Sequence, residues 1–175
     1  MDQHPLIGKI LADDYQIVSF LGKGGMGTVF VAHQISLNRQ VAIKILPLFD
    51  LSPEQICRFE SEIEAMATLC HPNIVTVHHR DRYGDPPTLY YVMELLEGGS
   101  LKNYLQQYGK LPPSIAVRQI SQIAEALSYA HEQGCIHRDI KPDNLLYTRN
   151  YRSLKIADFR SEERRVGKEF RSRGS

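Results

Sequence analysis

The sequence has few cysteines and no long apolar segment. Its three cysteines, Cys57, Cys70 and Cys135, lie far apart, with no CxxC pair and no histidine-rich cluster. This spacing excludes a zinc ribbon or a disulfide scaffold and favours a reducing, cytoplasmic compartment with buried or half-buried thiols. No apolar run in this chain is long enough to span a membrane, and residues 1–5 lack the basic and apolar regions of a signal peptide.

A strong excess of charge of either sign is also missing. The formal net charge of the 175 residues is +1, but residues 160–175 hold six basic and three acidic side chains. The residues before them are therefore slightly acidic, with a net charge of about −2. A mildly acidic body does not attract nucleic acid, so we expect no nucleic-acid partner.

The order of apolar patterns predicts an α+β chain in which a β-rich part precedes a helical part. Short apolar or alternating runs predict strands at residues 15–20, 28–32, 40–45, 74–79 and 88–95. The first three strands are expected to form an antiparallel meander. Gly98 and Gly99 interrupt the pattern and are expected to link the two parts.

Three helices are predicted from capping signals and apolar periodicity. Ser52, Pro53 and Gln55 form a capping box with proline at the first helical position, and this helix runs towards Leu69 before Pro72 ends it. The other two helices are predicted at 101–108 and 114–133. The apolar residues of the last helix that are expected to face a core are Val117, Ile120, Ile123, Ala124, Leu127 and Ala130.

Four glycines cluster between the first two predicted strands, in the segment Gly22-Lys23-Gly24-Gly25-Met26-Gly27-Thr28-Val29. Glycine is needed where backbone amides approach phosphate oxygens closely or where φ is positive. The pattern alone is weak evidence, because a simple turn can also contain it. A strand rather than a helix follows the cluster, which argues against a dinucleotide-binding fold.

Lys44 follows three apolar residues in Val41-Ala42-Ile43-Lys44, on a predicted strand, and its side chain is expected on the face opposite that of its immediate neighbours. An edge-strand lysine in water is the simpler interpretation. The functional interpretation is an ammonium group that grips phosphates and is held by a carboxylate of the next helix. That helix offers Glu60, Glu62 and Glu64, of which Glu62 lies beside the apolar stripe and is therefore our choice. The other two are predicted to be solvated.

The most specific motif is His137-Arg138-Asp139-Ile140-Lys141-Pro142-Asp143-Asn144. It resembles the catalytic loop of protein kinases, and the glycine cluster and Lys44 precede it in the order typical of that family. Residues 15–159 are therefore identified as similar to a bacterial-type serine/threonine protein kinase. The resemblance implies a bilobal fold, with an N-terminal extension at 1–14, an N-lobe and hinge at 15–97, and a partial helical C-lobe at 98–159.

The resemblance also implies ATP and Mg²⁺ as the small ligands and a protein carrying a serine or threonine hydroxyl as the substrate. Asp139 would accept or orient the proton of that hydroxyl. Lys141, followed by Pro142, matches the lysine that steadies the γ-phosphate in serine/threonine kinases. Asn144 and Asp158 match the two residues that hold magnesium through oxygen atoms.

The resemblance assigns a second set of residues to the nucleotide base. Met93 corresponds to the residue at the back of the adenine site, and Glu94 and Leu96 correspond to hinge residues that offer backbone groups to adenine. The apolar residues expected to sandwich the base are Leu21, Val29, Ala42 and Leu146. Apolar residues on strands are more often simply core. His137 is predicted to be a packed core histidine, and Arg138 matches an arginine that pairs with an activation-loop phosphate in many relatives.

The sequence departs from the family pattern after Phe159. Arg160 stands where a glycine is expected, and residues 160–175 resemble a translated sequencing adapter rather than a kinase segment. A natural basic tail is the alternative, and either tail is too polar to order itself. We therefore expect a longer parent protein, with any membrane anchor outside this chain, and a fragment that is inactive by itself.

Two functions of another class compete with the kinase hypothesis. One is a catalytically dead nucleotide-binding module that acts as a scaffold, and the other is a truncated decoy that binds a regulatory partner. The first is disfavoured because Lys44, Asp139, Asn144 and Asp158 are all present. No feature of the sequence supports the second.

Overall fold

The computed structural model describes residues 4–24, 27–47, 51–84 and 88–159. The predictions for Gly25, Met26 and residues 160–175 lie outside these ranges. The strands and helices are β1 (Ile10–Leu11), β2 (Tyr15–Gly24), β3 (Gly27–Gln34), β4 (Arg39–Pro47), α1 (Pro53–Ala67), β5 (Val77–Tyr83), β6 (Thr88–Met93), α2 (Leu101–Tyr108), α3 (Pro113–Glu132), a 3₁₀ turn at Pro142–Asn144, β7 (Leu145–Tyr147) and β8 (Leu154–Ile156).

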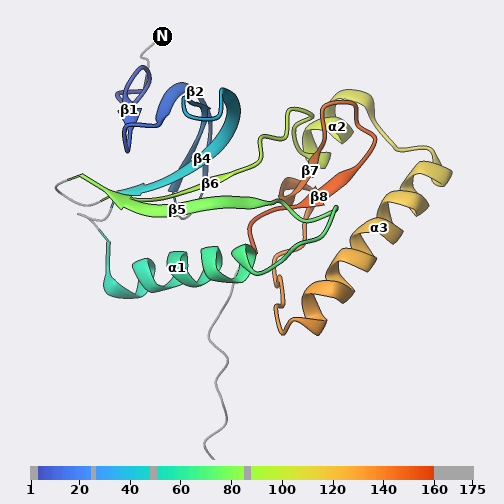
Figure 1. Cartoon of the computed structure of the whole chain (residues 1–175). Helices are drawn as coiled ribbons and strands as arrows, with labels where there is room; N and C mark the ends of the chain where they lie inside the picture. Colours follow the sequence, from blue (N-terminus) through green and yellow to red (C-terminus); the bar gives the residue numbers. More distant parts are fainter. Residues whose placement is uncertain (1–3, 25–26, 48–50, 85–87, 160–175) are drawn as a thin grey trace, which may run out of the picture.

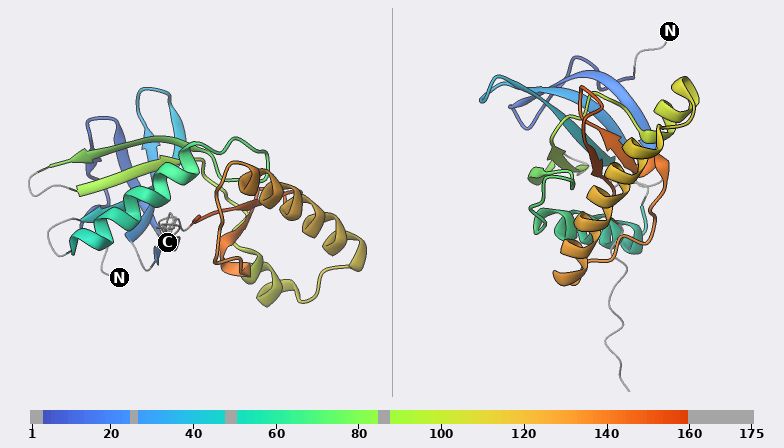
Figure 2. Two further views of the ribbon diagram at one scale, coloured as in Figure 1. Left: turned by 90° about the horizontal axis from the view of Figure 1, so that it is seen from below. Right: turned by 90° about the vertical axis from the view of Figure 1, so that its right-hand side faces the viewer.

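The chain forms two lobes (Figures 1 and 2). A six-stranded antiparallel sheet with the order β1-β2-β3-β4-β6-β5 makes the first lobe, and α1 lies along one of its faces. The second lobe contains α2, α3 and the small sheet of β7 and β8. The predicted meander and the α+β, bilobal arrangement are confirmed.

Strand β4 shows how the sheet separates two apolar layers. Ile43 and Ile45 are buried in the cluster on the face away from α1. Ala42 and Leu46 belong to the cluster that contains α1. Lys44 is two positions from each of them along the strand, so its side chain points to the same face of the sheet. Because successive strand residues point to opposite faces, the prediction that Lys44 lies opposite its apolar neighbours is confirmed.

Helix α1 begins as the capping box predicts. The Ser52 hydroxyl accepts a hydrogen bond from the Gln55 amide, and the Gln55 side chain accepts one from the Ser52 amide. Phe59, Ile63 and Met66 are completely buried against the sheet. Burial of each such side chain contributes about 1.5–3 kcal/mol, so packing rather than propensity holds the helix on the sheet.

Strand β5 differs from its prediction. The strand was expected at 74–79, but it spans Val77–Tyr83. Ile74 instead pairs with Ile156 of β8 through an isolated parallel bridge, and the Val75 amide donates to the Ile156 carbonyl at 2.9 Å. Ile74 and Val75 therefore lie at the junction of the lobes, where they bond to β8, and pairing with β6 begins only at Val77.

Helix α3 also corrects its prediction. Ile123 and Ala130 are buried and Leu127 is half-buried, but Val117 and Ile120 are 65% and 68% exposed. Ala124 is exposed as well. The buried residues, Gln119, Ile123, Ala126 and Ala130, follow a single helical stripe. Val117 and Ile120 lie far around the helix from that stripe, so periodicity alone assigned them to the wrong face.

Gly98 marks a close approach between the hinge and β7. A Cβ atom at this position would lie 2.5 Å from the Thr148 carbonyl oxygen and 2.6 Å from the Cβ of Tyr147. The Gly98 amide donates to the Tyr147 carbonyl, and the Tyr147 amide donates to the Gly99 carbonyl. Glycine is therefore required here for contact between the lobes, and not only as the predicted linker.

The predicted N-terminal extension contributes to the sheet. β1 pairs with β2, and Asp14, between them, accepts hydrogen bonds from the amide and the hydroxyl of Ser36 at 2.7 and 2.8 Å. These bonds, with a further one from Gln34, lower the pKa of the Asp14 carboxyl below its ordinary value. The network joins the start of β2 to the turn after β3.

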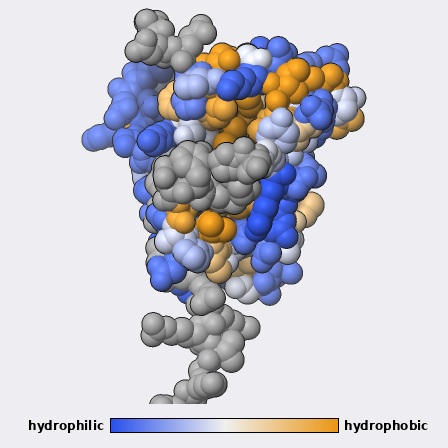
Figure 3. Space-filling model, turned by 90° about the vertical axis from the view of Figure 1, so that its left-hand side faces the viewer, coloured by the Kyte–Doolittle hydropathy of each residue, from blue (hydrophilic) through white to orange (hydrophobic). Residues whose placement is uncertain are grey.

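Parts of the surface remain apolar. On the first two strands, Ile10, Val18 and Phe20 are each close to half exposed. The end-on view in Figure 3 shows apolar areas between hydrophilic ones on this side of the molecule. No helix in the described ranges is long and apolar enough to cross a membrane.

All three cysteines are free, but two of them are more exposed than predicted. Cys57 lies on the outer side of α1, because it precedes the buried Phe59 by two residues and so points away from the sheet. Cys70 is exposed in the turn after the same helix. Only Cys135 is half-buried, as expected.

Candidate functional site

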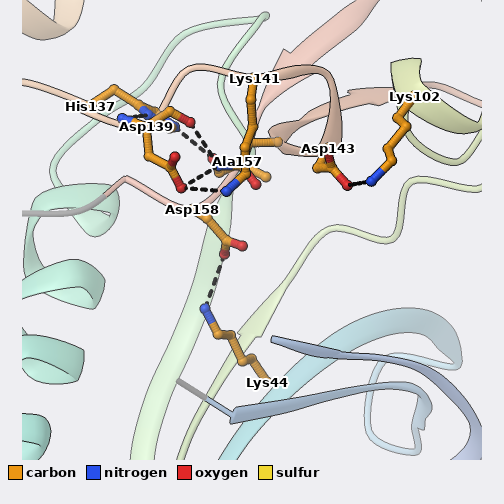
Figure 4. A network of polar contacts seen from close by, with 9 residues as sticks. Lys44, Lys102, His137, Asp139, Lys141, Asp143, Ala157 and Asp158 are labelled. Atoms are coloured by element: carbon orange, nitrogen blue, oxygen red, sulfur yellow. Dashed lines mark hydrogen bonds and ion pairs between the residues drawn. The ribbon is translucent and has the colours of Figure 1, made fainter. Parts of the chain in front are cut away.

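Lys44 is buried at the junction of the two lobes. Only 4% of the residue is exposed, and its Nζ lies 3.1 Å from Oδ1 of Asp158 (Figure 4). The rings of Phe59 and Tyr91 lie 5.8 and 5.7 Å from the same nitrogen. A buried ammonium needs such partners, so the interpretation of Lys44 as a solvated edge-strand lysine is wrong.

Glu62, the predicted carboxylate partner of Lys44, lies within α1, but its side chain is outside the described part of the structure. Glu64 is 64% exposed, as predicted, and Glu60 is 34% exposed. Both also form ion pairs with arginines of β5, Glu64 with Arg80 and Glu60 with Arg82.

The catalytic-loop residues are joined by short polar contacts (Figure 4). The Lys141 ammonium lies 2.8 Å from Oδ2 of Asp139. The Asn144 side-chain amide donates to the Asp139 carbonyl at 2.8 Å and to its Oδ2 at 3.2 Å. Arg138, with φ of 60°, is in the left-handed region that non-glycine residues rarely adopt. The loop thus holds the Asp139 carboxylate between an ammonium and an amide.

His137 is a buried structural residue, as predicted, with 1% exposure. Its Nδ1 accepts a hydrogen bond from the Asp139 amide at 3.2 Å, so Nε2 carries the proton and donates to the Ala157 carbonyl at 2.8 Å. The Phe159 ring packs edge-on against the imidazole, with centroids 4.7 Å apart. His137 therefore connects the backbone of the Asp139 loop to the segment that carries Asp158.

Asn144 and Asp158 are brought together by the backbone. β7 and β8 pair with Leu145 opposite Ile156, and the Ala157 amide donates to the Asn144 carbonyl at 2.9 Å. The Asn144 side-chain NH₂ group faces Asp139, which leaves its Oδ1 as the atom suited to a cation. A carboxylate and an amide oxygen are hard ligands, so this pair fits Mg²⁺.

Most of the residues assigned to the base gather in one apolar cluster. Ala42 and Met93 are buried in it, and Val29, Leu96 and Leu146 pack against it. Leu21 differs, because it is 50% exposed and belongs to neither cluster in the described chain.

At the hinge, the Glu94 amide already donates to the Thr76 carbonyl at 3.0 Å. Glu94 could therefore offer only its carbonyl oxygen to a base.

The base of the glycine segment is a continuous hairpin. Lys23 pairs with Thr28, Gly22 with Val29, and Gly24 with Gly27, so the strands reach further into the segment than predicted. Gly27 has a φ of 149°, and a Cβ atom there would lie 2.7 Å from the Ile45 carbonyl oxygen. The glycine at this position thus permits close packing of the hairpin on β4.

Sequence reasoning missed two ion pairs near the site. The Nζ atom of Lys102, on α2, lies 2.8 Å from Oδ1 of Asp143 in the catalytic loop, and both side chains are about half exposed. The Nζ atom of Lys155, on β8, lies 2.6 Å from Oε1 of Glu94, and both side chains are mostly buried. Lys155 stands between two buried apolar residues of a short strand, the same signal that identified Lys44, and this pattern could have revealed it.

Residues 15–170 match the sequence profile of a domain family described as "Protein kinase domain". The match begins at Tyr15, as the resemblance indicated, and continues past Phe159.

Individual proteins similar to this chain come from several bacteria. The chain is 41% identical over 157 residues to serine/threonine-protein kinase PrkC of Bacillus subtilis, covering 88% of this chain and 24% of that protein. It is 40% identical over 155 residues to a probable serine/threonine-protein kinase PknB of Lactococcus lactis, covering 87% of this chain and 24% of that protein. It is 38% identical over 159 residues to PknA of Mycobacterium tuberculosis, covering 89% and 37%. The matched part of the chain therefore spans only 24% to 37% of the length of these relatives.

Proposed function

Because this chain belongs to the protein kinase domain family, we propose that it binds MgATP and carries the phosphoryl-transfer residues of a serine/threonine protein kinase. The observation that carries the proposal is the 3.1 Å contact between Lys44 and Asp158. These residues come from different lobes and stand 114 positions apart. Lys44 would hold the phosphates of the nucleotide directly, and Asp158 would hold them through Mg²⁺.

The binding residues have complementary tasks. Lys44 would bind the α- and β-phosphates, and its burial strengthens that attraction because water screens it little. Asn144 and Asp158 would hold Mg²⁺, which supplies charge neutralisation between the phosphates when bound. Ala42, Met93 and Leu146 would enclose the adenine ring. The partnership of Lys44 with Glu62 remains part of this proposal.

In the transfer step, the substrate hydroxyl oxygen bonds to the γ-phosphorus while the bond from phosphorus to the β,γ-bridging oxygen breaks. Asp139 accepts the hydroxyl proton, and ADP leaves with the electron pair of the broken bond. Lys141, 2.8 Å from the Asp139 carboxylate, places a cation beside the transferred group. The pair Lys141-Pro142 supports serine or threonine as the acceptor, in a protein substrate.

Binding of MgATP to the purified chain tests this function. We expect weak binding by calorimetry, reduced about tenfold or more by Lys44→Met, because a charged hydrogen bond contributes about 1.5–3 kcal/mol. Lys9→Met is the matched control, since Lys9 is exposed and outside the site. Equal loss of binding in both variants, or no binding by the folded wild type, would contradict the proposal.

We expect no protein phosphorylation by the 175-residue chain alone. The exposed Val117 and Ile120 show that part of α3 has no apolar cover among the described residues. Transfer of labelled γ-phosphate to a generic basic protein, abolished by Asp139→Asn, would overturn this expectation and show that the chain is active by itself.

A further inference from the structure

The Glu94 side chain joins three segments of the chain behind the hinge. Its Oε1 accepts hydrogen bonds from the Lys155 ammonium at 2.6 Å and from the Thr76 amide at 2.8 Å. The Glu94 amide in turn donates to the Thr76 carbonyl at 3.0 Å. The Lys155 and Glu94 side chains are only 14% and 24% exposed, so this ion pair is better shielded than the Arg149–Glu97 pair of the hinge, whose side chains are 80% and 43% exposed.

The segment that carries Lys155 leads directly to the metal end of the site. Lys155 is the central residue of β8, between the buried Leu154 and Ile156, and Asp158 follows three positions later. β8 is also bonded to the segment before β5, because the Ile156 amide donates to the Asn73 carbonyl at 2.8 Å. The Asn73 side chain donates to the Leu154 carbonyl at 2.7 Å. Any shift of Lys155 relative to the hinge therefore moves the backbone that leads to Asp158.

We propose that the Glu94–Lys155 ion pair is a clasp that positions Asp158 relative to the hinge. Glu94 and Lys155 are positioning residues, since they act through the backbone of β8. The clasp couples the end of the site that holds the base to the end that holds the phosphates and metal. This inference rests on the proposed MgATP-binding function.

The hinge offers a matched control for this pair. Glu97 and Arg149 also join the hinge to the second lobe, with 3.4 Å between their charged atoms, but their side chains are 43% and 80% exposed. Glu94→Gln keeps an acceptor for the Thr76 amide while removing the charge, and Lys155→Met removes the ammonium. Glu97→Gln makes the same chemical change as the first variant at the exposed pair.

The experiment compares the affinities of each variant for MgATP and for adenosine, which lacks phosphates. We expect Glu94→Gln and Lys155→Met each to weaken MgATP binding by about fivefold to twentyfold and adenosine binding by less than about twofold. The double variant should be no weaker than either single variant, because both remove the same interaction. Glu97→Gln should leave both affinities within about twofold of wild type. Parallel loss of both ligands, or unchanged MgATP affinity in both clasp variants, would overturn the proposal.

A second measurement does not depend on nucleotide. Hydrogen exchange of the Val75 and Ile156 amides reports how firmly β8 is held, since these amides bond across the junction. We expect exchange to be about tenfold faster in Lys155→Met than in Glu97→Gln, and equal rates would refute the clasp. If the wild type binds no MgATP, the proposed function fails, and this exchange measurement still decides whether the clasp exists.

Discussion

The packing of Gly98 against β7 leads to a sharp prediction for Gly98→Ala. The new Cβ atom would meet the Thr148 carbonyl oxygen at 2.5 Å, about 0.9 Å closer than the shortest ordinary contact of 3.4 Å. The obstacles are the oxygens of Thr148 and Tyr147 and the Cβ of Tyr147, none of which can rotate away. The hinge or β7 must therefore shift.

The size of the effect follows from what such a shift breaks. The Gly98–Tyr147 and Tyr147–Gly99 backbone hydrogen bonds, at 3.1 and 2.8 Å, lie at the clash, and each contributes about 1 kcal/mol. Overpacking of a closely packed region adds about 1–3 kcal/mol. We expect a loss of about 3–5 kcal/mol, which for a chain of this size lowers the melting temperature by about 6–20 °C.

Thermal unfolding followed by circular dichroism measures this loss. Gly22→Ala is the matched control, because a Cβ atom at Gly22 meets nothing within 4 Å and its φ is not in the left-handed region. It should melt within about 2 °C of wild type. If Gly98→Ala also melts within that range, the close approach of hinge and β7 is wrong. An equal decrease in both variants would point to a general effect of replacing glycine.

Three further predictions concern other parts of the chain. The hydrogen bonds that lower the pKa of Asp14 stabilise the fold above its ordinary pKa, so stability should fall as the pH decreases below about 4, and Asp14→Asn should flatten that decrease in unfolding curves between pH 2.5 and 6. Replacing the exposed Val117 and Ile120 by Thr and Gln should change unfolding free energy by less than about 0.5 kcal/mol each and reduce aggregation in light scattering, whereas Ile123→Ala should cost about 2–5 kcal/mol. Removing residues 160–175 should leave the melting temperature and MgATP affinity unchanged, and a decrease in either would show that this polar segment belongs to the protein.

Local patterns in the sequence were sufficient for the three helices and for four of the five predicted strands, but not for the position of β5 or for the short strands β1, β7 and β8. The capping box predicted the start of α1, and the alternation around Lys44 predicted which face of the sheet it occupies. These features depend on neighbours within a few residues, whose geometry a helix or strand determines. The order of the glycine cluster, Lys44 and Asp139 was likewise enough to predict the family that the profile match shows.

Only the tertiary structure decided which distant residues meet. Ile74 left the predicted strand because β8, far along the chain, offers it a partner, and Val117 stayed exposed because α3 packs through another stripe. Glu94 was predicted to serve a base through its backbone, yet its side chain binds Lys155, 61 positions away. The periodicity of a sequence shows which face of a helix or strand is apolar. Whether that face is buried, and which charged side chains pair, depends on the residues of other segments that lie against it. Those neighbours are determined only when the lobes pack together.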